Sequence, residues 1–257
     1  MLGAAAAATV GADRTAGLRL PNLDPVAPYA VHAFRDAPGR HRLAFASATE
    51  NHGEGPLVIV GGRTNRRTPT MMASQLVDRA GGNGPQTSFS GVGVLRYTIS
   101  PDHAHWHLLS FMRYELRRAA DFRRVARDRK TGFCLGDRYG AGRPAFAAGA
   151  ARVGPRDFDT DCGKRAPGLL GVVEGISPGF GDDYKPRLEG QSVDVTGLPS
   201  GRYVLVHRAN ADRRVRELRY DDNASSVLLS LRRRAGRLPV VRILARCRST
   251  ARCPAPA

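Results

Sequence analysis

The clearest strand signals in this chain are Gly201-Arg-Tyr-Val-Leu-Val-His207 and Ala224-Ser-Ser-Val-Leu-Leu-Ser-Leu231. Both are short runs rich in β-branched and apolar residues, and turn-forming residues flank them. Gln191-Ser-Val-Asp-Val195 is a third such run, and Leu198-Pro-Ser-Gly201 has the composition of a hairpin turn. Spacings of this kind are typical of antiparallel sandwiches. The sequence therefore predicts a mainly β, antiparallel, sandwich-like single domain with long irregular loops, in which residues 224–231 form the final strand.

The length of 257 residues allows one large domain with a full core. Residues 1–17 are Ala-rich and predict a disordered or residual leader, so the domain is expected to span residues 18–257. Residues 61–91 are polar and Gly-rich, which predicts an excursion over the surface with one strand near residues 71–77. Residues 136–175 lack periodicity, and a loop of that length is usually functional or mobile. No segment approaches the roughly 20 apolar residues of a membrane span.

The net charge of +17 comes almost entirely from arginine, because Lys130, Lys164 and Lys185 are the only lysines. Apart from Arg232-Arg233-Arg234, the arginines are scattered, whereas a nucleic-acid interface would group them on one face or among aromatic residues. We therefore interpret the charge mainly as solubility, together with attraction to acidic polymers or cell-surface material. No specific nucleic-acid partner is predicted.

Four cysteines form an even set without a Cys-X-X-Cys pair, which argues against a zinc ribbon or a thioredoxin-like centre. Of the three possible connectivities, we prefer Cys134–Cys162 with Cys247–Cys253. Two disulfides imply an oxidising compartment, so a secreted or cell-surface location is expected.

His103-Ala-His-Trp-His107 places three of the seven histidines at alternate positions. On an extended strand these three imidazoles share one face, which favours a metal site over an incidental cluster on a half-exposed strand. The outer two Cα atoms would lie about 13 Å apart, so we expect a bend or bulge that draws the rings together. Both copper and zinc suit such a set. Trp106 would point to the opposite face and pack in the core.

Taken together, three motifs resemble the lysyl oxidase family, in the order in which that family has them. They are the histidine run with Tyr114-Glu-Leu116 beyond it, Lys130-Thr-Gly-Phe-Cys-Leu135, and Gly175-Ile-Ser-Pro-Gly-Phe-Gly-Asp-Asp-Tyr184. The tail from Gln191 to Leu231 also resembles the family, so the similarity covers about residues 18–231. With far fewer cysteines than animal members, the chain looks like a prokaryotic-type member.

The resemblance implies a copper(II) site at His103, His105 and His107, and a lysine tyrosylquinone cofactor formed from Lys130 and Tyr184. It also implies a copper-dependent amine oxidase of the protein-lysine 6-oxidase type, which oxidises primary amines or peptidyl lysine with O2 to aldehydes, hydrogen peroxide and ammonia. The alternative is a non-catalytic or hydrolytic metal-binding (Cu or Zn) extracellular β-domain, in which the long loop holds Lys130 and Tyr184 apart.

Asp182 and Asp183 are candidates for the general base because they lie beside Tyr184 in the sequence. For this pair we favour a solvated turn, since Asp is an ordinary turn residue. The competing interpretation of Lys130 is a surface lysine, and that of Tyr184 is a core or rim tyrosine.

Overall fold

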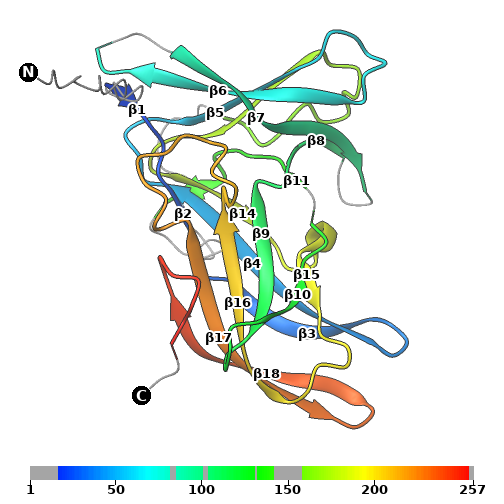
Figure 1. Ribbon diagram of the computed structural model, residues 1–257. Coiled ribbons are helices and arrows are strands. Elements are labelled where there is room, and N and C mark those ends of the chain that lie inside the picture. Colours follow the sequence, from blue (N-terminus) through cyan, green and yellow to red (C-terminus); the bar gives the residue numbers. More distant parts are fainter. Residues whose placement is uncertain (1–16, 82–84, 101–103, 131, 142–157, 255–257) are drawn as a thin grey trace, which may run out of the picture.

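The computed structural model describes residues 17–81, 85–100, 104–130, 132–141 and 158–254 (Figure 1). The predicted leader, residues 1–17, lies outside these ranges except for its last residue. Antiparallel strands in three sheets make up the fold, and the one helix in the described ranges is a 3-10 turn at Leu188–Gly190. The prediction of a mainly β fold is therefore confirmed. In the same ranges, no helix has the length and hydropathy needed to cross a bilayer.

A seven-stranded sheet contains the histidine strand and lies uppermost in Figure 1. Its order is β11-β8-β7-β6-β5-β13, with β1 paired to β6. These strands are β1 (Leu18–Arg19), β5 (Leu57–Gly62), β6 (Thr70–Arg79), β7 (Pro85–Ile99), β8 (Ala104–Leu109), β11 (Gly132–Phe133) and β13 (Gly171–Ile176).

A five-stranded sheet, in the order β10-β9-β16-β17-β18, contains the strong strand signals of the C-terminal third. Its members are β9 (Met112–Arg118), β10 (Arg124–Arg127), β16 (Gly201–Ala209), β17 (Ala224–Arg234) and β18 (Arg237–Cys247).

The third sheet is built around the long strand β4, which pairs with β14, β15, β2 and β3. Its members are β2 (Leu23–Pro25), β3 (Tyr29–Ala37), β4 (Arg40–Asn51), β12 (Tyr139–Gly140), β14 (Phe180–Tyr184) and β15 (Ser192–Asp194).

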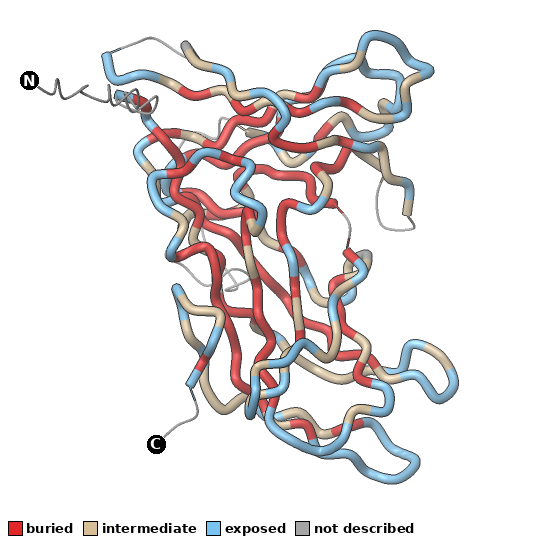
Figure 2. Tube along the Cα trace, in the orientation of Figure 1, coloured by how far each residue is buried: buried red, intermediate tan, exposed pale blue. Residues whose placement is uncertain are grey.

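One hydrophobic core joins the three sheets. It contains Phe45 of β4, Trp106 of β8 and Leu205 of β16, all with no exposed side-chain surface. Figure 2 shows that buried residues concentrate where the sheets meet, while the ends of the β3–β4 and β17–β18 hairpins are exposed. Because the sheets share this core, they form one packing unit.

Several expectations about individual segments were wrong. Residues 61–91 do not form an irregular surface segment, because β6 and much of β7 pair there as long antiparallel strands. Within this range, the sequence predicted only the strand near residues 71–77. Residues 224–231 are not the final strand, because β18 follows and pairs with them. Leu198–Gly201 is not a hairpin turn, since β15 before it pairs with β4 and β16 after it pairs with β9 and β17.

The preferred cysteine pairing is confirmed. Cys134 bonds Cys162, and Cys247 bonds Cys253, with Cα–Cα distances of 5.8 and 5.4 Å. The first bridge attaches the segment after β11 to residues that precede β13. The second closes the end of β18 back on itself.

Candidate active site

Lys130 and Tyr184 lie side by side although 53 residues separate them in the sequence. Lys130 follows β10 and is 7% exposed, and its Nζ lies 4.5 Å from the centroid of the Tyr184 ring. Tyr184 ends β14 and is 4% exposed. The long connection after Lys130 therefore does not hold the two residues apart, and Lys130 is not a surface lysine.

The ring of Tyr184 is held by contacts with the segment that follows Lys130. Its hydroxyl donates a hydrogen bond to the Cys134 carbonyl at 2.9 Å, and the Phe133 ring packs edge-on against it at 5.3 Å. Arg138 Nη2 donates to the same carbonyl at 3.1 Å. Because Cys134 is also tied to Cys162, the acceptor of the tyrosine hydroxyl belongs to a cross-linked backbone.

Asp182 lies on the same face of β14 as Tyr184, because alternate strand residues share a face. It has no exposed surface and accepts a hydrogen bond from Arg138 Nε at 2.5 Å. Burial raises the pKa of Asp182 to about 6, although the Arg138 charge opposes that rise. The expectation of a solvated turn is therefore wrong for Asp182: pairing of β14 with β4 makes this segment a strand and buries it. Asp183 alternates to the other face.

Burial also raises the pKa of the Tyr184 phenol well above 10, and the neighbouring Asp182 charge acts in the same direction. The phenol is thus neutral near pH 7. Arg138 lies 5.5 Å from the centroid of the same ring, so a cation faces both the carboxylate and the phenol.

Three residues of this site were missed from the sequence: the partly buried Arg138 and the buried Glu174 and Asp137. Glu174 of β13 accepts a hydrogen bond from the Leu135 amide at 3.2 Å, and burial raises its pKa well above the usual value. Asp137 accepts hydrogen bonds from the Ser177 amide at 2.8 Å and the Ser177 hydroxyl at 2.7 Å, which fastens the β13–β14 turn. A lone acid in the apolar run 172–176 was the available signal for Glu174.

Two of the three predicted metal ligands lie in the described part of the chain. His105 is partly buried and His107 is 2% exposed, and their ring centroids are 4.7 Å apart. Two neighbouring imidazoles at this spacing suit copper or zinc. His103 lies outside the described residues. Trp106 faces the opposite side and is fully buried, as expected.

The expected bulge does not occur between Ala104 and Leu109. This stretch pairs with β7 in a continuous register, with His105 opposite Thr98 and His107 opposite Arg96. Residues two apart on a strand face are already close enough for their rings to meet, so the described pair needs no bend.

Gly132 brings the lysine segment against the histidine strand. It pairs with Leu109 in the β11–β8 ladder, and a Cβ at this position would lie 2.5 Å from the His107 Cβ. Only glycine permits so close an approach. Gly132 therefore packs against His107, while Phe133 and the Cys134 carbonyl contact Tyr184.

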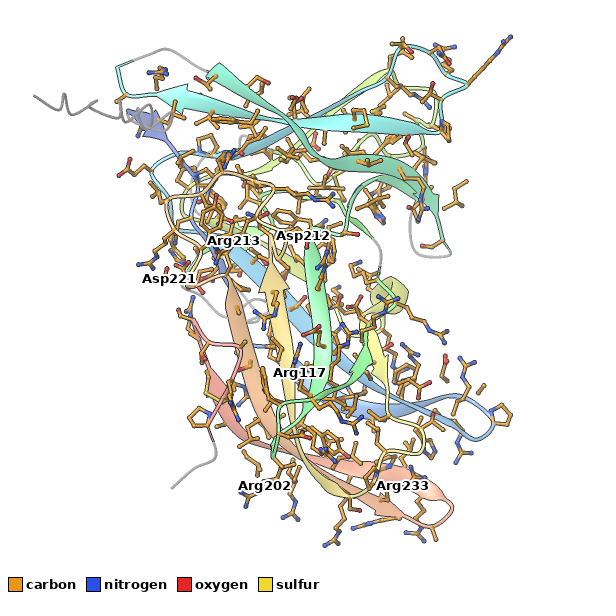
Figure 3. All side chains as sticks on the ribbon, in the orientation of Figure 1. Arg117, Arg202, Asp212, Arg213, Asp221 and Arg233 are labelled. Carbon is orange, nitrogen blue, oxygen red and sulfur yellow. A yellow bond between two sulfur atoms is a disulfide. The ribbon has the colours of Figure 1, made fainter. Side chains whose placement is uncertain are left out.

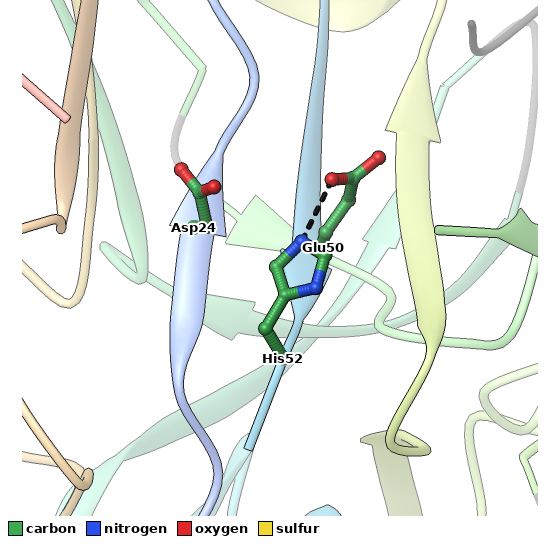
Figure 4. A group of neighbouring side chains, drawn as sticks. All are labelled: Asp24, Glu50 and His52. Carbon is green, nitrogen blue, oxygen red and sulfur yellow. Dashed lines mark hydrogen bonds and ion pairs between the residues drawn. The ribbon is translucent and has the colours of Figure 1, made fainter. Parts of the chain in front are cut away.

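Asp24, Glu50 and His52 form a second group with ligand atoms close together (Figure 4). Arg248 Nη2 lies 2.7 Å from Asp24 Oδ2 and 3.0 Å from Glu50 Oε2. The arginine already compensates the two carboxylates, so this group is best described as an ion-pair cluster.

A groove of about 960 Å³ reaches Lys130 from the surface and is lined by parts of β9 and β10 and the residues after β15. Asp128 lies in this lining and accepts a hydrogen bond from the Tyr114 amide at 2.8 Å. Burial raises the pKa of Asp128 to about 6. The groove is large enough to admit a side chain of several atoms, since ligand pockets of 300–1,000 Å³ are typical.

Comparison with known proteins adds independent information. The lysyl oxidase family model matches residues 159–238, a range that contains Tyr184 but neither Lys130 nor the three predicted metal ligands. Pig (Sus scrofa) protein-lysine 6-oxidase is 31% identical over 125 residues, which is 47% of this chain and 41% of the relative. The chicken (Gallus gallus) protein of that name is 30% identical over 123 residues, 47% of this chain and 24% of the relative.

The matched part spans well under half the length of these relatives. The family-model match includes β13, β14, β15, β16 and β17, but only the first two residues of β18. The chain is therefore similar to the lysyl oxidase family over residues 159–238, and to these protein-lysine 6-oxidases over 47% of its own length.

Proposed function

We propose that this protein is a copper-dependent amine oxidase whose lysine tyrosylquinone forms from Lys130 and Tyr184. The observation that carries the proposal is the 4.5 Å separation between Lys130 Nζ and the Tyr184 ring centroid, inside a buried site. The net reaction converts a primary amine, O2 and water into an aldehyde, ammonia and hydrogen peroxide. When present, copper and the quinone supply redox exchange with oxygen and an electron-accepting carbonyl.

His103, His105 and His107 are the proposed copper ligands, and the paired rings of His105 and His107 fit imidazole coordination. Zinc would fit the same donors, so metal identity is part of the test. Gly132 would let the lysine segment and the metal strand pack together without distorting either.

Asp182 is the proposed general base, rather than Asp183, because it shares the strand face of Tyr184. A carboxyl with a pKa of about 6 is largely ionised at neutral pH and can still accept and return a proton. Arg138 would hold this carboxylate in place and favour its charged form.

The groove that reaches Lys130 is the proposed path for the amine, whether a free primary amine or a peptidyl lysine. The two disulfides support maturation in an oxidising compartment, so we propose a secreted or cell-surface enzyme.

The test is peptide mass spectrometry on copper-loaded, aerated protein, combined with assay of amine-dependent hydrogen peroxide. We expect a covalent link between the Lys130 and Tyr184 peptides, and loss of both link and peroxide in Tyr184→Phe. Tyr203→Phe is the matched control, because Tyr203 is 2% exposed and its hydroxyl also donates to a backbone carbonyl, that of Pro199 at 2.8 Å.

Persistent peroxide production by Tyr184→Phe would refute the proposal. Full copper occupancy without a link in the wild type would instead favour the metal-binding alternative. A protein that takes up zinc and hydrolyses substrates without consuming oxygen would favour its hydrolytic form.

A further inference from the structure

Positive charge is concentrated in the C-terminal part of the chain, although arginines occur throughout the sequence. Residues 223–257 contain eight arginines and no acidic residue, against a net charge of +17 for the whole chain. These residues include β17 and β18, so the excess charge gathers at one edge of the five-stranded sheet. Arg202 and Arg233 lie at the same end of the molecule in Figure 3.

The register of the sheet places several of these arginines on one face. Arg202 of β16 lies opposite Ser230 of β17, which lies opposite Arg242 of β18. Arg232 is two residues beyond Ser230 and therefore points to the same face. The flanking residues Leu229 and Leu231 are buried in the main core, so the arginines occupy the outer face.

The small Ser230 side chain leaves a hollow between its arginine neighbours. This hollow has a volume of about 370 Å³. Among the residues that the structure describes, its lining contains no acidic and no aromatic side chain, and its polar members are Ser200, Arg202, Ser230, Arg232, Arg234 and Arg242.

These four arginines are exposed and, within the described part of the chain, form no ion pair. Other exposed arginines do form ion pairs, for example Arg40 with Asp36, Arg113 with Asp212 and Arg118 with Asp121. Four like charges around one hollow repel one another, and an anion bound there would relieve that repulsion. Guanidinium groups match tetrahedral oxyanions with paired hydrogen bonds.

We propose that Arg202, Arg232, Arg234 and Arg242 bind sulfate or phosphate ester groups of an acidic glycan. Arg233 and Arg237 continue the positive surface beyond the hollow, which suits a linear chain of charges better than one small anion. The absence of aromatic residues in the lining disfavours single-stranded nucleic acid, which is bound largely by base stacking. The disulfides also indicate a compartment where glycans are the common polyanions.

This surface is distinct from the groove at Lys130, and its role does not depend on the oxidase chemistry. The test measures binding of dextran sulfate to the full chain over a series of salt concentrations. The pocket variant replaces the four arginines by Gln (R202Q/R232Q/R234Q/R242Q). The control variant, R19Q/R66Q/R67Q/R79Q, removes the same charge from exposed arginines of the seven-stranded sheet and its loops.

We expect the pocket variant to bind at least about tenfold more weakly at low salt, with the slope of log K against log salt reduced by about four. The control variant should keep most of the wild-type slope. Both variants should retain the wild-type thermal midpoint and oxidation of a small soluble amine. If the fourfold variant does not fold, the pairs R202Q/R242Q and R232Q/R234Q replace it, each with an expected slope change of about two.

Equal weakening in the pocket and control variants would overturn the proposal in favour of diffuse attraction. Tighter binding of an oligothymidylate with the same number of charges would overturn it in favour of nucleic acid. A third outcome is that inorganic sulfate competes for the site as well as dextran sulfate does at the same concentration of sulfate groups. That result would overturn the glycan proposal, because the site would then bind a single anion. Binding of uncharged dextran would show that charge is not the basis of recognition.

Discussion

Replacing Gly132 by Ala should disturb the packing of β11 against the histidine strand β8. The added Cβ would lie 2.5 Å from the Cβ of His107, whereas carbon atoms normally pack at about 3.5–4.0 Å. The β11–β8 ladder must therefore open by roughly 1 Å. Overpacking of this kind costs about 1–3 kcal/mol of unfolding free energy. Because His107 and the lysine segment would move apart, metal affinity should fall as well.

Gly62→Ala is the matched control, since Gly62 also lies in a strand of the same sheet but has open space where its Cβ would be. Removing a strand glycine there should stabilise the protein by about 0.5–1 kcal/mol. Urea unfolding of the two variants, with unchanged m-values, gives the difference directly. Copper titration gives the effect on the histidines. If Gly132→Ala proves as stable as Gly62→Ala and binds copper equally well, β11 does not pack on His107 as described.

Two further predictions concern stability. Burial lowers the pKa of His207 to about 4, so between about pH 6.5 and 4 the unfolded chain binds the extra proton and acid destabilises the fold. The unfolding free energy should fall by about 3 kcal/mol at pH 4, and most of this fall should disappear in His207→Phe. Urea unfolding at a series of pH values measures it. The prediction fails if the unfolding free energies of wild type and variant fall in parallel with pH. Replacing both cysteines of the Cys134–Cys162 bridge by serine should lower the unfolding free energy by about 3.6 kcal/mol, against about 2.4 kcal/mol for Cys247–Cys253. The first bridge closes the longer loop, because its cysteines are 28 residues apart in sequence rather than 6. Calorimetry of both variants should give this order of thermal midpoints, and the reverse order would show that loop closure does not govern the effect.

Strands with a strong local signal could be predicted, but exposed strands could not. Residues 201–207 and 224–231 have the apolar, β-branched composition of strands, and they form β16 and β17. β18 was missed because it is rich in exposed arginine, and its strand character comes from pairing with β17. Residues 29–37, the half-exposed β3, were missed for the same reason: the neighbouring strand β4 supplies the pairing.

The candidate site divides in a similar way. Lys130, Tyr184 and the histidines were recognisable because they belong to local motifs. The environment of Asp182 was not, since a run of Gly and Asp predicts a turn until a partner strand is known. Arg138 reaches Asp182 and the Cys134 carbonyl only through the folded arrangement of three segments, so no local pattern marks it.

The position of Cys134 sets an order for assembly. Its carbonyl is the hydrogen-bond acceptor of Tyr184, and its sulfur atom is bonded to Cys162. While the thiols are reduced, the backbone that orients the phenol toward Lys130 lacks its covalent anchor. We therefore expect formation of the Cys134–Cys162 disulfide to precede any modification of Tyr184. A chain in a reducing compartment would keep an unmodified tyrosine. If the chain is exported to an oxidising compartment, as we propose, its proposed quinone cofactor would form only after it has left the cytoplasm.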